Sequence, residues 1–207
     1  MNRNSMDMEN NIPVKRICVF CGSNSGQRPA YKDAAKKLGK ALTARGIGLV
    51  YGGGSVGLMG VIAETVMREK GEVIGVIPKA LFSREIVRRE VTEFHEVASM
   101  HERKTLMVQL SDAFIAMPGG CGTMDEFFEI VTWSQLELHA KPIGILNVEG
   151  YFDLLLQFID HIIRERFARP EHGQLILRSD NPDELLQMLI QKKTLPPSGK
   201  LIDWKES

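Results

Sequence analysis

The chain has 207 residues, of which 43% are hydrophobic and 25% are charged, so it can bury the core of one domain. Lys and Arg together number 26, and so do Asp and Glu, which leaves a formal net charge of zero. This balance argues against a nucleic-acid partner or a membrane surface, because both select for a basic excess. The three cysteines do not indicate a disulfide framework, and no apolar run approaches membrane-spanning length, so we expect a soluble, cytoplasmic protein.

The chain opens with a polar segment, residues 1–13, which we expect to be a disordered tail because it lacks an apolar core. Beyond it, short apolar runs alternate with amphipathic helical stretches. The expected strands are residues 16–20, 47–51, 73–77, 113–117 and 142–147, and the expected helices are residues 31–45, 58–70, 100–110, 123–139 and 151–166. Apolar strands separated by helices are typical of a parallel sheet that is covered on both faces. The pattern predicts a single-domain α/β fold with a Rossmann-like doubly wound parallel sheet over residues 14–193, followed by an extension at 194–207.

The first expected strand contains a C-x-x-C pattern, formed by Cys18 and Cys21. A redox pair needs its first thiol at a helix N-terminus, where the thiolate is stabilised. Both cysteines lie instead within the apolar run 17–21, so we interpret them as packing residues of a buried strand in a reducing compartment.

Glycine and serine are concentrated in three of the turns that follow expected strands. These turns are residues 22–26, 52–57 and 119–123. The carboxyl ends of parallel strands meet at one edge of a sheet, and ligands bind there. Three such turns at one edge imply a ligand that lies across it and approaches the backbone at several points. We therefore include Ser23 and Gly54 among the substrate-binding candidates.

The second turn matches the dinucleotide fingerprint literally, as Gly52-x-Gly54-x-x-Gly57. The context differs, because the turn follows the second strand, and the next strand ends in 77–79 without an acid for a ribose diol. Glu72 stands at the beginning of that strand, which places it at the opposite edge of the sheet. The pattern disfavours a dinucleotide oxidoreductase. It leaves open whether these glycines serve tight strand–helix packing or contact with a ligand.

The third turn, Pro118 to Thr123, is the stronger signal. Consecutive glycines let backbone N–H groups converge into an anion-binding nest, and the helix that follows adds its positive end. Thr123 can cap this helix and can also donate its hydroxyl to a phosphate oxygen. No Lys-Ser/Thr pair follows the glycines, so the turn is not a Walker loop and ATP hydrolysis is not indicated. The turn predicts the phosphate site of a nucleotide enzyme.

Glu126 has two interpretations that the residues alone leave equally open. Thr123-x-x-Glu126 is a capping box, which explains the carboxylate by helix initiation. A carboxylate beside a phosphate nest, with Asp125 next to it, also costs electrostatic energy unless it has a chemical role.

Arg103 stands in the apolar stripe of the expected helix 100–110, where an unpaired charge would be prohibitively costly. It belongs either to a structural ion pair or to a site where it faces phosphate or Glu126. Lys104, one residue on, is expected to be solvated. No metal is expected, because His95 and His101 have no metal-ligand spacing with Cys, Asp or Glu, and no cofactor is expected either.

The segment Pro118-Gly119-Gly120-Cys121-Gly122-Thr123-Met124-Asp125-Glu126 fits the motif PGGxGTxxE, and through it the chain resembles the LONELY GUY (LOG) family. Members of that family are cytokinin riboside 5′-monophosphate phosphoribohydrolases, formerly mislabelled as lysine decarboxylases. The similarity continues in residues 21–23, 51–60, 100–104, 132–135, 141–144 and 147–151. Cys121 and Asp125 depart from residues that are common in the family, although neither occupies a fixed motif position.

The resemblance implies that Arg103 and Glu126 form a catalytic pair. It also implies a homodimer whose site lies near the subunit interface, with larger homo-oligomers in some relatives. The family's nucleotide-binding positions correspond in this chain to Glu85, Arg103, Lys104, Gly119, Gly120, Cys121, Gly122, Thr123, Met124, Asp125, Glu126 and Thr132.

The expected reaction is hydrolysis of the N-glycosidic bond of a purine nucleoside 5′-monophosphate, in which C1′ becomes positively charged as in glycoside hydrolysis. Glu126 would stabilise this charge and position the attacking water, while Arg103 would lower the pKa of Glu126 and keep it ionised. Two alternatives stay open. One is a pyridoxal-phosphate-dependent lysine decarboxylase, for which Lys104 is the only lysine in the motif cluster. The other is a non-catalytic nucleotide-binding or sensor module.

Overall fold

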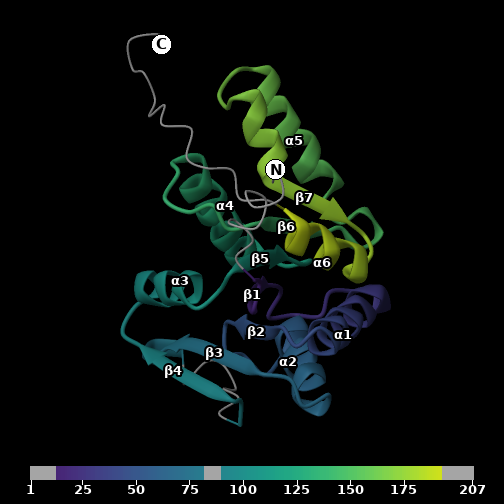
Figure 1. The fold of residues 1–207 in the computed structure, drawn as a ribbon, viewed down its shortest axis with the longest axis vertical. Helices are drawn as coiled ribbons and strands as arrows, with labels where there is room; N and C mark the ends of the chain where they lie inside the picture. The colour runs from purple at the N-terminus through teal and green to yellow at the C-terminus, as the bar shows by residue number, and fades with distance from the viewer. Residues whose placement is uncertain (1–12, 82–89, 193–207) are drawn as a thin grey trace, which may run out of the picture.

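The structure is a computed structural model, and it describes residues 13–81 and 90–192 (Figure 1). Seven strands form one parallel sheet in the order β4-β3-β2-β1-β5-β6-β7, flanked by helices on both faces. The strands are β1 (Arg16–Phe20), β2 (Gly48–Tyr51), β3 (Val73–Pro78), β4 (Glu93–Val97), β5 (Ala113–Ala116), β6 (Ile143–Leu146) and β7 (Ile176–Ser179). The helices are α1 (Pro29–Ala44), α2 (Gly57–Arg68), α3 (Met100–Gln109), α4 (Cys121–Gln135), α5 (Asp153–Arg164) and α6 (Pro182–Gln191), with short 3-10 turns η1 (Lys79–Leu81), η2 (Val148–Gly150) and η3 (Pro170–Leu175).

Strand β1 lies at the centre of the sheet and is buried on both faces. Alternate side chains of a strand point to opposite faces. Ile17 and Val19 pack with α1, α2 and α6, whereas Cys18 and Phe20 pack with α3, α4 and α5. The predicted doubly wound α/β fold is confirmed, and so is the packing role of Cys18 and Cys21, which are both buried.

The order of the strands fixes where a ligand can bind. From β1 the chain builds outward through β2, β3 and β4, then returns to the other side of β1 with β5 and continues to β7. The chain segments that follow β1 and β5 therefore run to opposite faces of the sheet. A crevice opens between them at the carboxyl ends of these two strands. The turns after β1 and β5 lie at this switch point.

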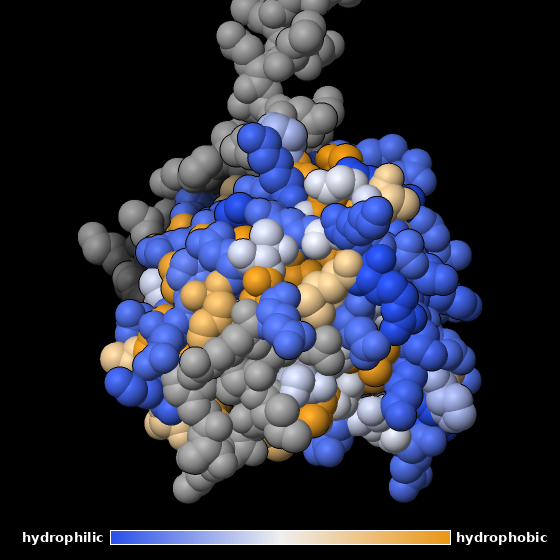
Figure 2. All heavy atoms as spheres, turned by 90° about the horizontal axis from the view of Figure 1, so that it is seen from below, coloured by the Kyte–Doolittle hydropathy of each residue, from blue (hydrophilic) through white to orange (hydrophobic). Residues whose placement is uncertain are grey.

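The edge strands β4 and β7 and the helix α6 were absent from the sequence prediction. Strand β4 reads Glu-Phe-His-Glu-Val, and only Val97 in it is buried, so it lacks the continuous apolar run of an inner strand. The face of the molecule shown in Figure 2 is mostly hydrophilic, with hydrophobic side chains in small, separate groups. Within residues 13–81 and 90–192, no helix combines the length and apolarity that a bilayer crossing requires.

Candidate active site

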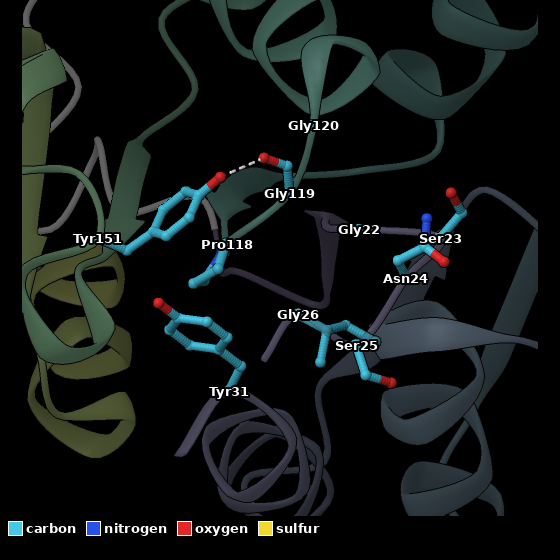
Figure 3. A pocket seen from close by; sticks show the side chains of 11 residues that line it. Gly22, Ser23, Asn24, Ser25, Gly26, Tyr31, Pro118, Gly119, Gly120 and Tyr151 are labelled. Carbon is cyan, nitrogen blue, oxygen red and sulfur yellow. Dashed lines mark hydrogen bonds between the residues drawn. The ribbon is translucent and has the colours of Figure 1, made fainter. Parts of the chain in front are cut away.

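The glycine-rich turns after β1, β2 and β5 meet at the carboxyl edge of the sheet, as predicted. Figure 3 shows the turns after β1 and β5 side by side. The Gly22 N–H donates to the carbonyl oxygen of Pro118 at 3.0 Å, and the Leu58 N–H donates to the carbonyl oxygen of Gly22 at 3.0 Å. A Cβ atom at Gly22 would lie 3.4 Å from the Cα atom of Gly119, so the turns after β1 and β5 are in van der Waals contact. Backbone from three turns is therefore gathered at the switch point.

Helix α4 begins at Cys121, with Gly120 as its N-cap residue and no side chain that caps it. The first backbone bond of the helix runs from the Met124 N–H to the Gly120 carbonyl oxygen at 3.2 Å. Among the described residues, the N–H groups of residues 120–123 have no acceptor. A helix N-terminus with free N–H groups and the positive end of the helix dipole is suited to bind an anion.

The predicted capping box of Thr123 and Glu126 is wrong. Because the helix starts at Cys121, Thr123 is already its third residue and cannot be the N-cap. Thr123 is buried, and its Oγ1 occupies the space that a side chain at Gly119 would need. Helix initiation therefore does not explain Glu126, which lies in the second turn of α4.

A true N-terminal cap fixes the start of α3. The Ser99 hydroxyl accepts from the Glu102 N–H at 3.1 Å, and the Glu102 carboxylate accepts from the Ala98 N–H at 2.7 Å. One turn further, the sequence reaches Arg103, which is only 6% exposed. The cap thus fixes where α3 begins, and Arg103, one turn into the helix, points into the protein.

The guanidinium of Arg103 is held by two backbone carbonyls, one inside β3 and one in the turn after β2. Its Nε donates to the Val76 carbonyl oxygen at 3.1 Å, and its Nη2 donates to the Gly52 carbonyl oxygen at 2.9 Å. A Cβ atom at Gly52 would overlap Nη2. In the described part of the chain, no carboxylate forms an ion pair with Arg103, so the expected partner is replaced by these carbonyls.

The pKa of Glu126 is raised from its ordinary value of 4.5 to about 7. Burial of the carboxyl group is the largest cause, and the neighbouring Asp125 and Glu129 add to it. The positive charges of Arg103 and Lys104 lower the pKa but do not compensate for burial. We expected Arg103 to keep this carboxylate ionised with a lowered pKa, and that expectation is wrong because desolvation outweighs the attraction.

Lys104 is not a freely solvated side chain, contrary to the expectation from its position beside Arg103. Its ammonium lies 3.2 Å from Asp125 and 3.1 Å from Glu129, and only 11% of its side chain is exposed. Burial alone would lower its pKa, but the hydrogen bonds to Glu129 and Asp125 raise it. Glu129 was missed from the sequence, although its spacing of four from Asp125 places both on one face of the helix.

Two glycines of the fingerprint in the second turn, Gly52 and Gly57, serve packing. Gly52 leaves room for Arg103, and Gly57 has a φ of 62° and lies so close to the backbone of Ser23 that a side chain would overlap it. Gly54 is buried. Glu72 bonds to Arg16 at 2.8–2.9 Å, at the edge of the sheet opposite the crevice. This confirms that it cannot serve a ribose there.

Comparison with known proteins gives the family. The sequence profile of the family described as "Possible lysine decarboxylase" matches residues 59–189. The chain is 51% identical over 175 residues to a probable cytokinin riboside 5′-monophosphate phosphoribohydrolase of Oryza sativa subsp. japonica (84% of this chain, 77% of the rice protein). It is 52% identical over 182 residues to a cytokinin riboside 5′-monophosphate phosphoribohydrolase of Arabidopsis thaliana (88% and 85%). The chain belongs to the LONELY GUY (LOG) family.

The LOG chain also shares its fold with solved structures of other proteins. The molybdenum cofactor carrier protein of Chlamydomonas reinhardtii superposes with a TM-score of 0.64 at 18% sequence identity, over 86% of this chain and 98% of the other. A likeness at that identity extends to the fold alone.

The description "lysine decarboxylase" does not fit the residues of this LOG site. Such an enzyme holds pyridoxal phosphate on a lysine whose amine must become neutral to form a Schiff base. Lys104, the lysine of the motif cluster, is fixed as a cation between Asp125 and Glu129, and its pKa is raised. The described residues also contain no group of three or more His, Cys, Asp or Glu that could hold a metal ion.

The remaining LOG-type positions are spread along α4 and beyond it. Cys121 and Gly122 are exposed at the start of the helix, and Met124 packs against the core. Thr132 is exposed far along the same helix, about 13 Å from Thr123 at the usual helical rise, so the turn and Thr132 do not lie together. Glu85 lies outside the described residues.

A pocket of about 240 Å³ opens beside the turns that gather at the switch point (Figure 3). It shares Ser23, Gly119 and Gly120 with the predicted substrate-binding set, while Arg103 and Glu126 are not part of its wall. Its other lining residues are Gly22, Asn24, Ser25, Gly26, Tyr31, Leu58, Pro118 and Tyr151. The two tyrosines were not predicted as site residues, although Tyr151 belongs to the segment 147–151 that carries part of the family resemblance.

Proposed function

We propose that this LOG protein hydrolyses the N-glycosidic bond of purine nucleoside 5′-monophosphates, releasing the free base and ribose 5-phosphate. The base would be adenine or an N6-modified adenine, as in the activation of cytokinins. One observation carries the proposal: Glu126, a carboxylate with a pKa of about 7, lies on the helix whose uncapped N-terminus offers free N–H groups to an anion. The relatives from rice and Arabidopsis carry this activity in their names.

The 5′-phosphate would lie at the N-terminus of α4, against the N–H groups of residues 120–123 and the hydroxyl of Thr123. This anchor is remote from the bond that breaks, so its binding energy orients the ribose for the reaction. The further residues to which we assign contact with the nucleotide are Ser23, Gly54, Glu85, Lys104, Gly119, Met124, Asp125 and Thr132.

At the reacting end, the bond between C1′ and the base nitrogen breaks, and its electron pair leaves with the base. Glu126 in its ionised form would stabilise the positive charge on C1′ and accept a proton from the attacking water, whose oxygen bonds to C1′. The same proton then neutralises the departing base. A pKa near ambient pH suits a group that both accepts and returns a proton. Arg103 would hold a positive charge beside this carboxylate.

The proposed assembly is a homodimer, or a larger homo-oligomer, with the site near a subunit interface. Exposed apolar side chains support an association of this kind. Leu154 and Phe158 stand one turn apart on α5 and are 79% and 56% exposed, and no residue of α5 is fully buried. A sizing column with light scattering measures the mass directly, and a monomer at micromolar concentration would contradict the proposal.

A substrate panel tests the function. AMP, isopentenyladenosine monophosphate and the two corresponding nucleosides are incubated with the purified protein, and the released base is quantified by chromatography. The proposal predicts base and ribose 5-phosphate in equal amounts from the monophosphates and little from the nucleosides. Equal cleavage of nucleosides would refute the phosphate anchor. Nucleotide that stays bound and intact through long incubation would instead identify a sensor module.

A further inference from the structure

One side chain outside the predicted site bonds directly to the phosphate-binding turn. The hydroxyl of Tyr151 donates to the carbonyl oxygen of Gly119 at 2.5 Å (Figure 3). Tyr151 follows η2, between β6 and α5, and so reaches the turn from a distant part of the sequence. We infer that Tyr151 is a positioning residue that orients the peptide between Gly119 and Gly120 for phosphate binding. The inference rests on the proposed function of this turn.

The geometry of the peptide bond links the tyrosine to the anion site. The bond between Gly119 and Gly120 is trans and planar, so its C=O and N–H groups point in opposite directions. Fixing the carbonyl of Gly119 on the Tyr151 hydroxyl therefore fixes the Gly120 N–H on the side away from the tyrosine. Gly120 is the N-cap residue of α4, and its N–H has no acceptor among the described residues. The residues on both sides of this peptide are glycines, which place few limits on backbone rotation, so the turn alone does not fix the orientation of the peptide.

The segment that carries Tyr151 is itself held in place. The Asn147 side chain accepts from the Phe152 N–H at 2.7 Å and donates to the Asp153 carboxylate at 2.7 Å, which closes the loop on both sides of the tyrosine. Glu149 in the same loop pairs with Arg28 at 3.0 Å, next to the start of α1. These bonds hold the backbone of the segment that carries Tyr151 in one position relative to the turn.

The ring of Tyr151 is fixed by aromatic contacts. It meets the ring of Phe152 edge-on at 4.9 Å and that of Tyr31 at 5.7 Å between centroids. A phenol has a single proton to donate, and here Gly119 takes it, so the hydroxyl of Tyr151 is not a donor to a phosphate. Its action on a ligand is therefore indirect, through the Gly120 N–H.

Tyr31 provides a matched control for this role. It lines the same pocket and shares the aromatic contact, but its hydroxyl forms no hydrogen bond within residues 13–81 and 90–192. Tyr151→Phe and Tyr31→Phe thus remove the same atom from the same pocket, and only the first removes a bond to the turn. Both keep the ring, so the packing is preserved, and thermal unfolding verifies that each variant folds like the unaltered protein.

Binding is measured by titration calorimetry with ribose 5-phosphate, which carries the phosphate but is not hydrolysed, and with adenosine, which lacks it. Tyr151→Phe should weaken ribose 5-phosphate binding about two- to tenfold, the usual worth of one neutral hydrogen bond, and leave adenosine binding unchanged. In the base-release assay KM should rise by a similar factor and kcat should change less. Tyr31→Phe should change ribose 5-phosphate binding and KM less than Tyr151→Phe does, because it leaves the bond to the turn intact.

Equal binding of ribose 5-phosphate by the two variants would overturn the inference, and so would an equal loss of both ligands in Tyr151→Phe. Failure of the unaltered protein to bind ribose 5-phosphate is a different result, since it would refute the phosphate-binding function of the turn itself.

Discussion

Replacing Glu126 by glutamine should change how the stability of the protein depends on pH. Burial raises the pKa of this carboxyl group from 4.5 to about 7, against the opposing attraction of Arg103. Glutamine has nearly the same shape and no ionisable group, so the variant keeps the packing and removes only the titration. The difference in unfolding free energy between the two proteins then isolates the cost of the buried charge.

The sign and size follow from the two pKa values. Below pH 4.5 the carboxyl group is protonated in both the folded and the unfolded chain. As the pH rises from 4.5 to about 7, the unfolded chain releases the proton while the folded chain keeps it, so the unaltered protein loses stability. At about 1.4 kcal/mol for each tenfold difference in proton affinity, and with partial access of solvent to the side chain, the loss amounts to about 2–3 kcal/mol.

The assay is urea unfolding of both proteins at pH 5, 6, 7 and 8. The variant should gain relative stability from pH 5 to 7 and hold its advantage at pH 8, with unchanged m values. Glu69→Gln, which neutralises an exposed carboxylate at the end of α2, controls for the loss of one surface charge. A difference between Glu126→Gln and the unaltered protein that is the same at every pH would refute the reasoning.

Three further outcomes are expected. Gly52→Ala should lower the unfolding free energy by about 1–3 kcal/mol and abolish base release, because its Cβ would displace Arg103, whereas Gly122→Ala has open space and should keep its melting temperature. Thermal melts compare the two, and equal melting temperatures would contradict this. Iodoacetamide should label the exposed Cys121 alone among the three cysteines, and AMP should slow the labelling, as mass spectrometry can measure. The kcat/KM for base release should rise with pH and level off above about pH 7, where Glu126 becomes ionised, and a flat profile between pH 5 and 8 would exclude it as the titrating base.

The elements that position the site could be predicted from the sequence because they are locally encoded. Strand β1 has the expected bounds, 16–20, and its apolar run is buried as the pattern requires. The glycine turns that follow the inner strands were found by composition, and the sheet brings them to one edge. The edge strand β4 was missed because only one of its five residues is buried, so its sequence carries no buried-strand signal.

The electrostatics of the site could not be predicted in the same way, because they depend on distances across the fold. The capping-box pattern at Thr123 was misleading, since the helix starts two residues earlier, at Cys121. A pattern of residue types also cannot weigh burial against a neighbouring charge. For this reason the sequence predicted a lowered pKa for Glu126, whereas burial raises it. Tyr151 was not predicted as a site residue for a similar reason, because its hydrogen bond to Gly119 joins segments far apart in the chain.

The central claim is that Glu126 carries out the chemistry at the phosphate-binding turn. The most direct test is the kcat/KM for adenine release from AMP at pH 8, measured for the unaltered protein and for Glu126→Gln. Loss of a general base costs about two to four orders of magnitude in rate, so we predict a fall of at least about 100-fold, with ribose 5-phosphate binding retained. A glutamine variant that folds, binds ribose 5-phosphate and releases adenine at nearly the original rate would contradict the account.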